Sequence, residues 1–197
     1  MPTLVVPFRG AAGKSRLRRL PQAVRAAVAM AMLEDVVAAC LATGATFVVS
    51  PERRSIAEAV FVDDPGNGQG AAVAVGLDAA VAAGGTAPFL VVNADVACVT
   101  ARDLFTLAGA VPDDGIAYVA ARDGTTNALA LADASLFVPV YGPGSAERFA
   151  ALAASRALDL ENLRDDVDTV DDLEQLHRRL GPRTRRALER ARLKALA

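Results

Sequence analysis

Residues 1–17, MPTLVVPFRGAAGKSRL, run from a short apolar segment into a glycine-containing basic loop. The apolar residues 4–6 predict a buried strand, and the glycines at positions 10 and 13 predict a loop after it. A lysine and an arginine follow the second glycine closely. α/β proteins use this order of strand, glycine loop and cations to present backbone N–H groups and positive charge to phosphates. We therefore expect an α/β fold with an anion-binding loop after its first strand.

This loop differs from a Walker A motif, because Gly10 and Gly13 are only three positions apart instead of five. The spacing favours a nucleotidyltransferase, in which a basic N-terminal loop covers a nucleoside triphosphate, over a P-loop hydrolase. In such an enzyme Arg9, Lys14 and Arg16 would contact the triphosphate and stabilise the charge that develops during transfer. A solvated basic turn ahead of a helix would give the same pattern.

Strand-like and helix-like segments alternate along the chain. The predicted strands are residues 4–6, 46–50, 60–62, 89–92, 116–120 and 128–131, with a short edge element at 158–160. The predicted helices are 21–43, 55–59, 71–83, 101–110, 145–154, 170–180 and a basic C-terminal helix or tail at 183–197. This order implies a Rossmann-like doubly wound, mostly parallel sheet with helices on both faces, in a single domain spanning residues 1–197. Ligands bind such sheets at the carboxyl ends of the strands.

The composition excludes several classes of function. A formal net charge of -2 argues against a general nucleic-acid-binding protein. No apolar run reaches the length of a membrane span, and no signal peptide is expected. Cys40 and Cys98 have apolar neighbours and no CxxC spacing, as expected of buried thiols in the cytoplasm. His177 lies in a charged helical pattern, which argues against a histidine triad or a zinc site. The alanine-rich helices leave a homodimer open.

Acidic residues follow two of the predicted elements. Asp95 comes after the buried strand 89–92, where a carboxylate is well placed to hold Mg²⁺, a hard cation that prefers oxygen ligands. In the extended segment 165–169, Asp166 and Asp168 lie on one face and repel each other unless a cation lies between them. We therefore expect a Mg²⁺ site formed by these three carboxylates. The alternatives are a turn residue after the strand and a helix N-cap in the acidic segment.

Two glycine-rich segments offer donors to a second anion. They are DGTTN at 123–127 and YGPGS at 141–145, with one strand-like run between them. Small hydroxyl residues among glycines expose N–H and O–H groups, and Ser145 begins a predicted helix whose positive end favours phosphate. Each segment alone is typical of an ordinary turn, whereas the two together favour an anion site.

Together these segments resemble a known family. PFRGAAGKSRL, NAD after FLVV, GTTNAL, YGPGSAERF and DVDTVDDL are similar, in this order, to motifs of the phospholactate/phosphoenolpyruvate guanylyltransferases of coenzyme F-420 biosynthesis. The last three motifs discriminate best, because the first two are shared with molybdenum-cofactor guanylyltransferases and many other nucleotidyltransferases. The resemblance covers nearly the whole chain and implies a fold like that of the nucleotide-diphospho-sugar transferases.

The resemblance also implies a reaction. GTP and a small phosphorylated three-carbon acid, phosphoenolpyruvate or 2-phospho-L-lactate, would combine with release of pyrophosphate. The phosphate of the acid would attack the α-phosphorus of GTP, so catalysis would rest on positioning and charge neutralisation. Mg²⁺ would lie on Asp95, Asp166 and Asp168, and Lys14 would grip a phosphate.

For the acceptor, the resemblance implies binding by Thr126, Gly142 and Ser145, with Thr125 and Asn127 supporting their loop.

Three positions depart from the family pattern. Ala72 stands where relatives carry Asn or Ser, Ala97 where they carry Pro, and Phe149 where many carry His. These departures leave two alternatives open: a nucleotidyltransferase with another acceptor, of the molybdenum-cofactor type, and a nucleotide-binding domain without turnover. A nucleotide-sugar glycosyltransferase is disfavoured, because the segment NADVA after the central strand has one Asp instead of a DxD motif.

Overall fold

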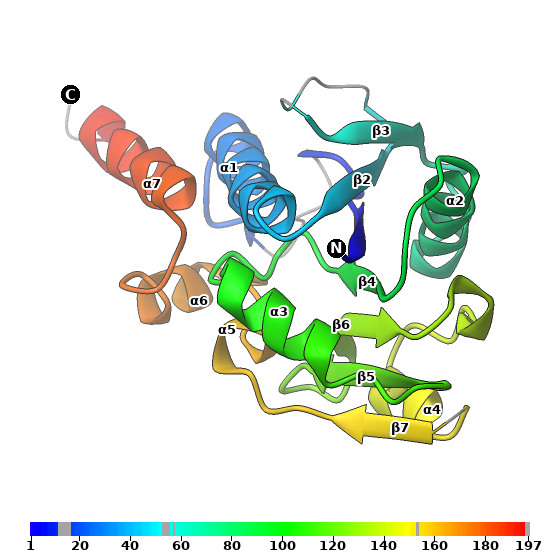
Figure 1. Ribbon diagram of the computed structural model, residues 1–197. Helices are drawn as coiled ribbons and strands as arrows, with labels where there is room; N and C mark the ends of the chain where they lie inside the picture. Colours follow the sequence, from blue (N-terminus) through cyan, green and yellow to red (C-terminus); the bar gives the residue numbers. More distant parts are fainter. Residues whose placement is uncertain (12–16, 53–55, 57, 153, 196–197) are drawn as a thin grey trace.

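A computed structural model describes the chain except for residues 12–16, 53–55, 57, 153 and 196–197 (Figure 1). Within the described residues, seven strands form one sheet in the order β3-β2-β1-β4-β6-β5-β7. The strands are β1 (Thr3–Pro7), β2 (Ala45–Ser50), β3 (Val60–Asp63), β4 (Phe89–Val92), β5 (Gly115–Ala120), β6 (Thr126–Leu131) and β7 (Ala154–Ala157). The helices are α1 (Gln22–Leu41), α2 (Gln69–Ala82), α3 (Ala101–Gly109), α4 (Ser145–Ala150), α5 (Glu161–Arg164), α6 (Val170–Gln175) and α7 (Pro182–Ala195), with a 3-10 helix η3 (Ala134–Leu136).

The sheet is mostly parallel, as the sequence predicts. Strands β3, β2, β1 and β4 pair in parallel, β5 pairs in parallel with β7, and β6 runs antiparallel to both β4 and β5. Because β6 is reversed, it begins at the edge of the sheet where β4 ends. The amide nitrogen of Asn93 donates to the carbonyl oxygen of Asn127 over 3.0 Å at this edge. The start of one strand and the end of the next therefore share one side of the molecule.

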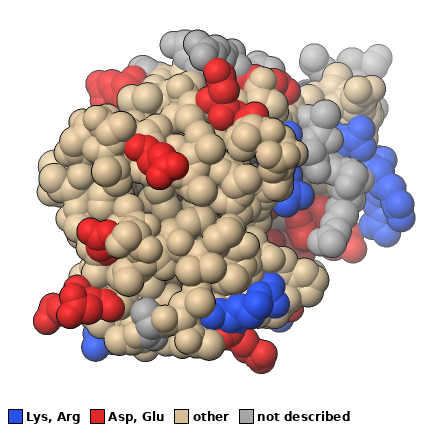
Figure 2. Space-filling model, turned by 90° about the vertical axis from the view of Figure 1, so that its right-hand side faces the viewer, with Lys and Arg blue, Asp and Glu red and all other residues tan. Residues whose placement is uncertain are grey.

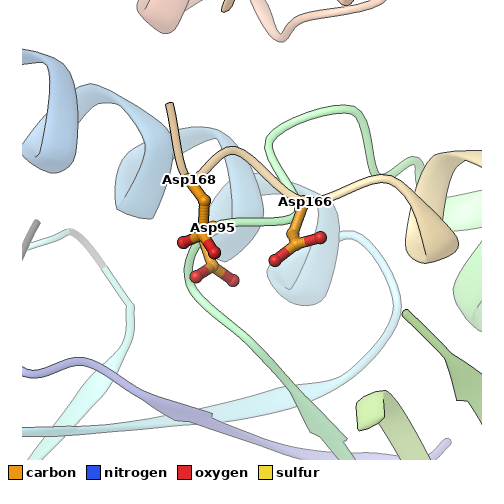
Figure 3. A group of neighbouring side chains, drawn as sticks. All are labelled: Asp95, Asp166 and Asp168. Carbon is orange, nitrogen blue, oxygen red and sulfur yellow. The ribbon is translucent and has the colours of Figure 1, made fainter. Parts of the chain in front are cut away.

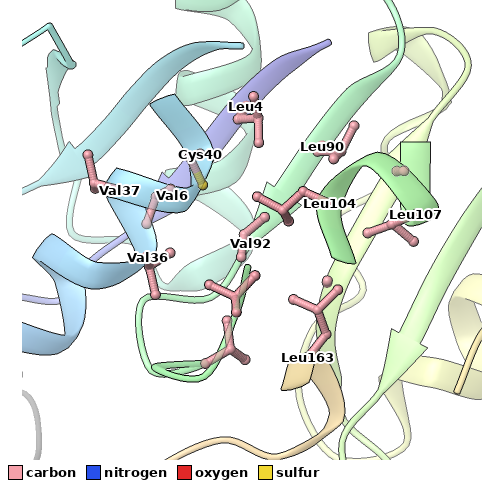
Figure 4. Close-up of a cluster of buried hydrophobic side chains, with 14 of the residues drawn as sticks. Leu4, Val6, Val36, Val37, Cys40, Leu90, Val92, Leu104, Leu107 and Leu163 are labelled. Atoms are coloured by element: carbon pink, nitrogen blue, oxygen red, sulfur yellow. The ribbon is translucent and has the colours of Figure 1, made fainter. Parts of the chain in front are cut away.

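Helices cover both faces of the sheet, and the alternation of side chains along each strand feeds two cores. In β1, Leu4 and Val6 join the core under α1 and α3, whereas Val5 joins the core under α2 and α4. Figure 4 shows part of the first core, where side chains of β1 and β4 meet those of α1 and α3. Apolar runs without polar alternation are expected of strands that are buried on both faces.

Helix α2 packs closely on the sheet at Gly76. A Cβ atom at this position would lie 2.5 Å from Cγ1 of Val5 and 2.7 Å from Cγ2 of Val49. The close approach packs the middle of α2 directly against β1 and β2. Figure 2 shows that the outer face of the molecule on this side carries few charged residues, in keeping with the alanine-rich sequence of α2.

The C-terminal basic segment forms α7, which packs on α1. Asp35 of α1 is 6% exposed, and its carboxylate accepts from the amide nitrogens of Arg183 and Thr184 at 3.0 and 2.8 Å. The hydroxyl of Thr184 also donates to it over 2.8 Å. Asp35 therefore caps the first turn of α7, where backbone N–H groups have no partner inside the helix.

Two element predictions are wrong. The predicted helix 145–154 ends at Ala150, and its last residue begins β7, which pairs with β5 in the register Gly115↔Ala154. The edge strand is therefore 154–157 instead of 158–160. The run AALAASRAL has neither a helical nor a strand period, so only pairing with β5 decides its conformation.

Elsewhere the differences are boundary shifts and two short helices, η3 and α5, that the sequence analysis did not predict. The predicted helix 170–180 ends at Gln175, and β6 begins at Thr126, two residues before its predicted start at 128. The predicted short helix 55–59 lies partly outside the described residues. Among the described helices, none combines the length and apolar character that crossing a membrane requires.

Candidate functional site

A cavity of about 420 Å³ opens at the edge of the sheet where β1 and β4 end and β6 begins. It brings together the ends of several distant segments. Its walls include Phe8, Arg9 and Gly10 after β1, Gln69 and Ala72 of α2, Asn93 and Asp95 after β4, residues 123–127 apart from Gly124, Tyr141 and Gly142, and Asp166 and Asp168. This is the edge where ligands of such sheets are expected.

Most of the residues predicted for the site reach this cavity. Arg9, Asp95, Thr126, Asn127, Gly142, Asp166 and Asp168 all line it. Ser145 is fully buried and meets the cavity through Thr126, whose hydroxyl lies 3.1 Å from its own. Lys14 and Arg16 lie outside the described residues.

The three carboxylates of the predicted metal site converge. Asp95, Asp166 and Asp168 each offer an oxygen, and these oxygens lie within 4.8 Å of one another. Figure 3 shows them extending from the loop after β4 and from the segment between α5 and α6. An all-oxygen, trianionic set of this size fits a hard divalent cation such as Mg²⁺. The competing capping role falls to Thr169, whose side chain accepts from the amide nitrogen of Asp172.

The electrostatics of this cluster favour a cation. Burial raises the pKa of Asp166 to about 6, and the neighbouring charges of Asp95 and Asp168 add to the effect. At neutral pH the ionised form of Asp166 is therefore destabilised by burial and by the negative charges of its two neighbours. A divalent cation among the three carboxylates would remove that repulsion and stabilise the ionised form.

Amide side chains form a chain of hydrogen bonds across the floor of the cavity. Gln69 donates to Oδ1 of Asn93 over 2.7 Å, and Nδ2 of Asn93 donates to the carbonyl oxygen of Thr126 over 3.1 Å. Asn127 donates in turn to the carbonyl oxygen of Arg164 over 3.0 Å. These bonds connect α2, β4, β6 and α5. The sequence analysis missed Gln69, for which the only signal is a polar residue after a glycine turn.

On the other side of the cavity, the loop 140–144 is held by Arg148 of α4. Its guanidinium donates to the carbonyl oxygens of Val140, Tyr141 and Pro143 at 2.9, 3.3 and 2.7 Å. Gly142 within this loop has a φ of 109°, a conformation that favours glycine. The guanidinium thus holds the conformation of this turn by hydrogen bonds to three of its carbonyl oxygens.

The three departures from the family pattern have different settings. Phe149 is 1% exposed and packs edge-on against Tyr141, with ring centroids 5.2 Å apart, so it belongs to the core. Ala97 is also buried, and its carbonyl oxygen accepts from the amide nitrogen of Gly181 over 2.8 Å. Of the three, Ala72 alone lines the cavity.

Comparison with known proteins places the chain among nucleotidyltransferases. Residues 11–167 match the MobA-like NTP transferase domain family. The chain is 35% identical to the phosphoenolpyruvate guanylyltransferase of Sphaerobacter thermophilus, over 87% of this chain and 90% of that protein. It is 33% identical to the 2-phospho-L-lactate guanylyltransferase of Natrialba magadii, over 86% and 80% of the two chains.

The fold is also similar to that of solved structures. A crystal structure from Desulfovibrio desulfuricans, assigned to the nucleotide-diphospho-sugar transferases, superposes with a TM-score of 0.72 at 17% identity. The similarity covers 95% of this chain and 94% of the other. At this identity the match supports the fold alone, and it agrees with the sheet order described above.

Proposed function

Because this chain belongs to the phosphoenolpyruvate and 2-phospho-L-lactate guanylyltransferases within the MobA-like NTP transferase family, we propose that it joins GMP from GTP to a small phosphorylated three-carbon acid. Pyrophosphate is the second product. The observation that carries the proposal is the convergence of Asp95, Asp166 and Asp168 on a cavity of about 420 Å³. The cavity is also lined by the glycine turn at Gly142 and by Thr126, whose hydroxyl lies 3.1 Å from that of Ser145.

The two ends of the cavity suit two different substrates. Near the end of β1, Arg9 and Gly10 offer a cation and a backbone N–H group to the triphosphate, and Lys14 and Arg16 follow them in sequence. Near the start of β6, Thr126 and Gly142 offer donors to the phosphate and carboxylate of the acid. The carboxylate triad lines the same cavity, and in the proposed reaction the two reacting phosphates meet at the cation it would hold.

In the proposed reaction, an oxygen of the acid's phosphate attacks the α-phosphorus of GTP, and the bond to pyrophosphate breaks. Both reactants are anions, so the chain must hold them in line and offset their repulsion. Asp95, Asp166 and Asp168 would hold Mg²⁺, which when bound neutralises charge on the reacting phosphates. Thr126 orients the attacking phosphate, and the basic loop stabilises the departing pyrophosphate.

We propose phosphoenolpyruvate as the acceptor, because a relative named as a phosphoenolpyruvate guanylyltransferase is 35% identical over most of the chain. 2-phospho-L-lactate carries the same phosphate and carboxylate on a saturated instead of an unsaturated carbon chain, and is the second candidate. Through the family resemblance, the product would enter the synthesis of coenzyme F-420 in the cytoplasm. An apolar contact to the carbon chain, where the two acids differ, discriminates between them by only about 10- to 200-fold.

The test is pyrophosphate release with Mg²⁺ from GTP, ATP or CTP, each paired with phosphoenolpyruvate, 2-phospho-L-lactate or 3-phosphoglycerate. Release with GTP and one of these acids supports the proposal and identifies the acceptor. Release only with another nucleotide would contradict guanine specificity. This outcome is worth testing because Ala72, which stands where relatives carry Asn or Ser, lines the cavity. Tight GTP binding without release from any pair would favour a binding domain without turnover.

A further inference from the structure

A buried carboxylate, Asp165, immediately precedes the metal-site residue Asp166 but does not line the cavity of about 420 Å³ that the metal-site residues line. The side chain of Asp165 is 2% exposed, although it carries a charge. Asp165 accepts hydrogen bonds from three guanidinium groups: Arg122 at 2.8 Å, Arg164 at 3.3 Å, and Arg179 through its second oxygen. A buried charge needs such partners, because leaving it unpaired costs several kcal/mol.

The three arginines come from three different segments. Arg122 follows β5 and directly precedes the loop 123–127, Arg164 ends α5, and Arg179 lies between α6 and α7. Arg179 also donates to Oδ1 of Asn162 over 3.3 Å. Asp165 therefore ties together the loop that carries the acceptor-side donors and both flanks of the acidic segment.

Backbone hydrogen bonds hold the acidic segment at its other points. The amide nitrogen of Val167 donates to the carbonyl oxygen of Asp95 over 3.0 Å. After it, Oδ2 of Asp172 accepts from the amide nitrogen of Asp168 over 3.1 Å. Asp165 supplies the anchor at the upstream end. In an extended segment its side chain and that of Asp166 lie on opposite sides, so one faces the arginines while the other faces the cavity.

We propose that Asp165 and its three arginines, here called the arginine hub, form a positioning group for the metal site. Three carboxylates within 4.8 Å repel one another, and that repulsion favours conformations in which the segment moves away from Asp95. The arginine hub resists this movement by fixing the residue before Asp166. It also links the metal site to the acceptor loop through Arg122. The link between this role and catalysis rests on the proposed function. The effect of the arginine hub on metal binding does not.

The test measures Mn²⁺ binding by electron paramagnetic resonance on the full chain without substrates, and then the KM values for GTP and for the acid. The main variant is Arg122→Gln, because Arg122 is 68% exposed on its side chain and its removal leaves the core intact. Groups that hydrogen-bond a metal ligand directly contribute about 10- to 100-fold to metal affinity. Arg122 acts one residue further away, through Asp165, so the loss should be at or below about 10-fold. We expect that loss together with a higher KM for the acid, and partial rescue of both in Arg122→Lys.

Asp165→Asn is the second variant, and Asp159→Asn is its control. Asp159 also pairs with Arg164, over 2.5 Å, but its side chain is 77% exposed and it lies outside the cavity. Asp159→Asn should bind Mn²⁺ as the parent chain does. A lowered melting temperature with unchanged Mn²⁺ affinity and unchanged KM values in Arg122→Gln would make the arginine hub merely structural and overturn the proposal.

The same measurements separate this proposal from the proposed function. A parent chain that binds Mn²⁺ but releases no pyrophosphate contradicts guanylyl transfer, while the comparison of variants still decides the role of the arginine hub. A parent chain that transfers GMP but binds no Mn²⁺ at Asp95, Asp166 and Asp168 overturns the positioning role and leaves the transfer reaction standing.

Discussion

The amide nitrogen of Val167 donates a hydrogen bond of 3.0 Å to the carbonyl oxygen of Asp95. This single bond joins the loop after β4 to a segment far along the chain. It places Asp166 and Asp168, the residues on either side of Val167, opposite the carboxylate of Asp95. A hydrogen bond between backbone groups therefore brings together the two segments whose carboxylates form the proposed metal site.

Replacing Asp95 by Asn should abolish Mg²⁺-dependent pyrophosphate release while the protein stays folded. Asn keeps the shape of the side chain but removes the charge that the cation needs, and a loss of about 100-fold or more in kcat/KM is expected. Asp78→Asn, at an exposed position of α2, is the matched control and should behave as the parent chain does. Normal turnover by Asp95→Asn would place the metal elsewhere.

The stability of the metal-free protein should increase as the pH falls from 7 to 5. The pKa of Asp166 is raised to about 6, mainly by burial, so the folded state binds a proton in a range where the unfolded state does not. Its ionised form costs the folded state roughly 2–3 kcal/mol at neutral pH. Thermal unfolding should show the trend, and Mg²⁺ should stabilise the protein more at pH 7 than at pH 5.

The Asp166→Asn variant isolates this effect. Asn does not titrate, so the variant should lose most of the change in melting temperature between pH 7 and pH 5. An identical pH dependence in the variant and the parent chain would assign the effect to other groups.

Asp165 should act in the opposite direction at lower pH. Burial would raise the pKa of Asp165, but the hydrogen bonds from Arg122, Arg179 and Arg164 outweigh it and lower the pKa to about 2. The stability from this lowered pKa, about 2 kcal/mol, is complete above the unfolded pKa near 4 and is lost as the pH falls towards 2. Urea unfolding at pH 5 and pH 2.5 should show this loss in the parent chain. Asp165→Asn should show a smaller change over the same range, and an equal change would contradict the prediction.

Replacing Gly181 by Ala should loosen α7. A Cβ atom there would lie 2.2 Å from Cγ of Asp35, which caps α7 and cannot retreat without losing its hydrogen bonds. The free energy of unfolding should fall by about 1–3 kcal/mol, as in other overpacked sites. Gly109→Ala in α3 is the control, because open space surrounds that position. It should be neutral or slightly stabilising, by about 0.5–1 kcal/mol. Equal urea midpoints for both variants would contradict the close packing.

Replacing Ser145 by Ala should weaken binding of the acid without affecting GTP. The hydroxyl of Ser145 lies 3.1 Å from that of Thr126, and both residues are almost fully buried. Without it, the Thr126 hydroxyl loses its orienting partner, at a cost of about 1–2 kcal/mol, or roughly a tenfold increase in KM for the acid. Initial-rate measurements with each substrate varied in turn provide the test. A parallel rise in both KM values would point to a general loss of structure.

Local sequence patterns were sufficient for much of the fold. The run 89–92 has no polar residue and forms the central strand β4, and residues 4–6 form most of β1. Such predictions succeed because burial on both faces requires apolar residues at every position. The prediction for the run 150–158 was wrong because its alanines favour a helix by local propensity. Pairing with β5, which lies far away in sequence, overrides that preference.

For the site, the sequence by itself determined which residue types were present: the three carboxylates, the glycine turns and the hydroxyls next to them. Spacing along one extended segment also predicted that Asp166 and Asp168 lie on the same side. Only the tertiary structure decided that these groups meet. The reversal of β6, the chain of amides from Gln69 to Asn127 and the three arginines around Asp165 all join segments distant in sequence. Their geometry depends on the register of the sheet and on burial, which no local pattern encodes.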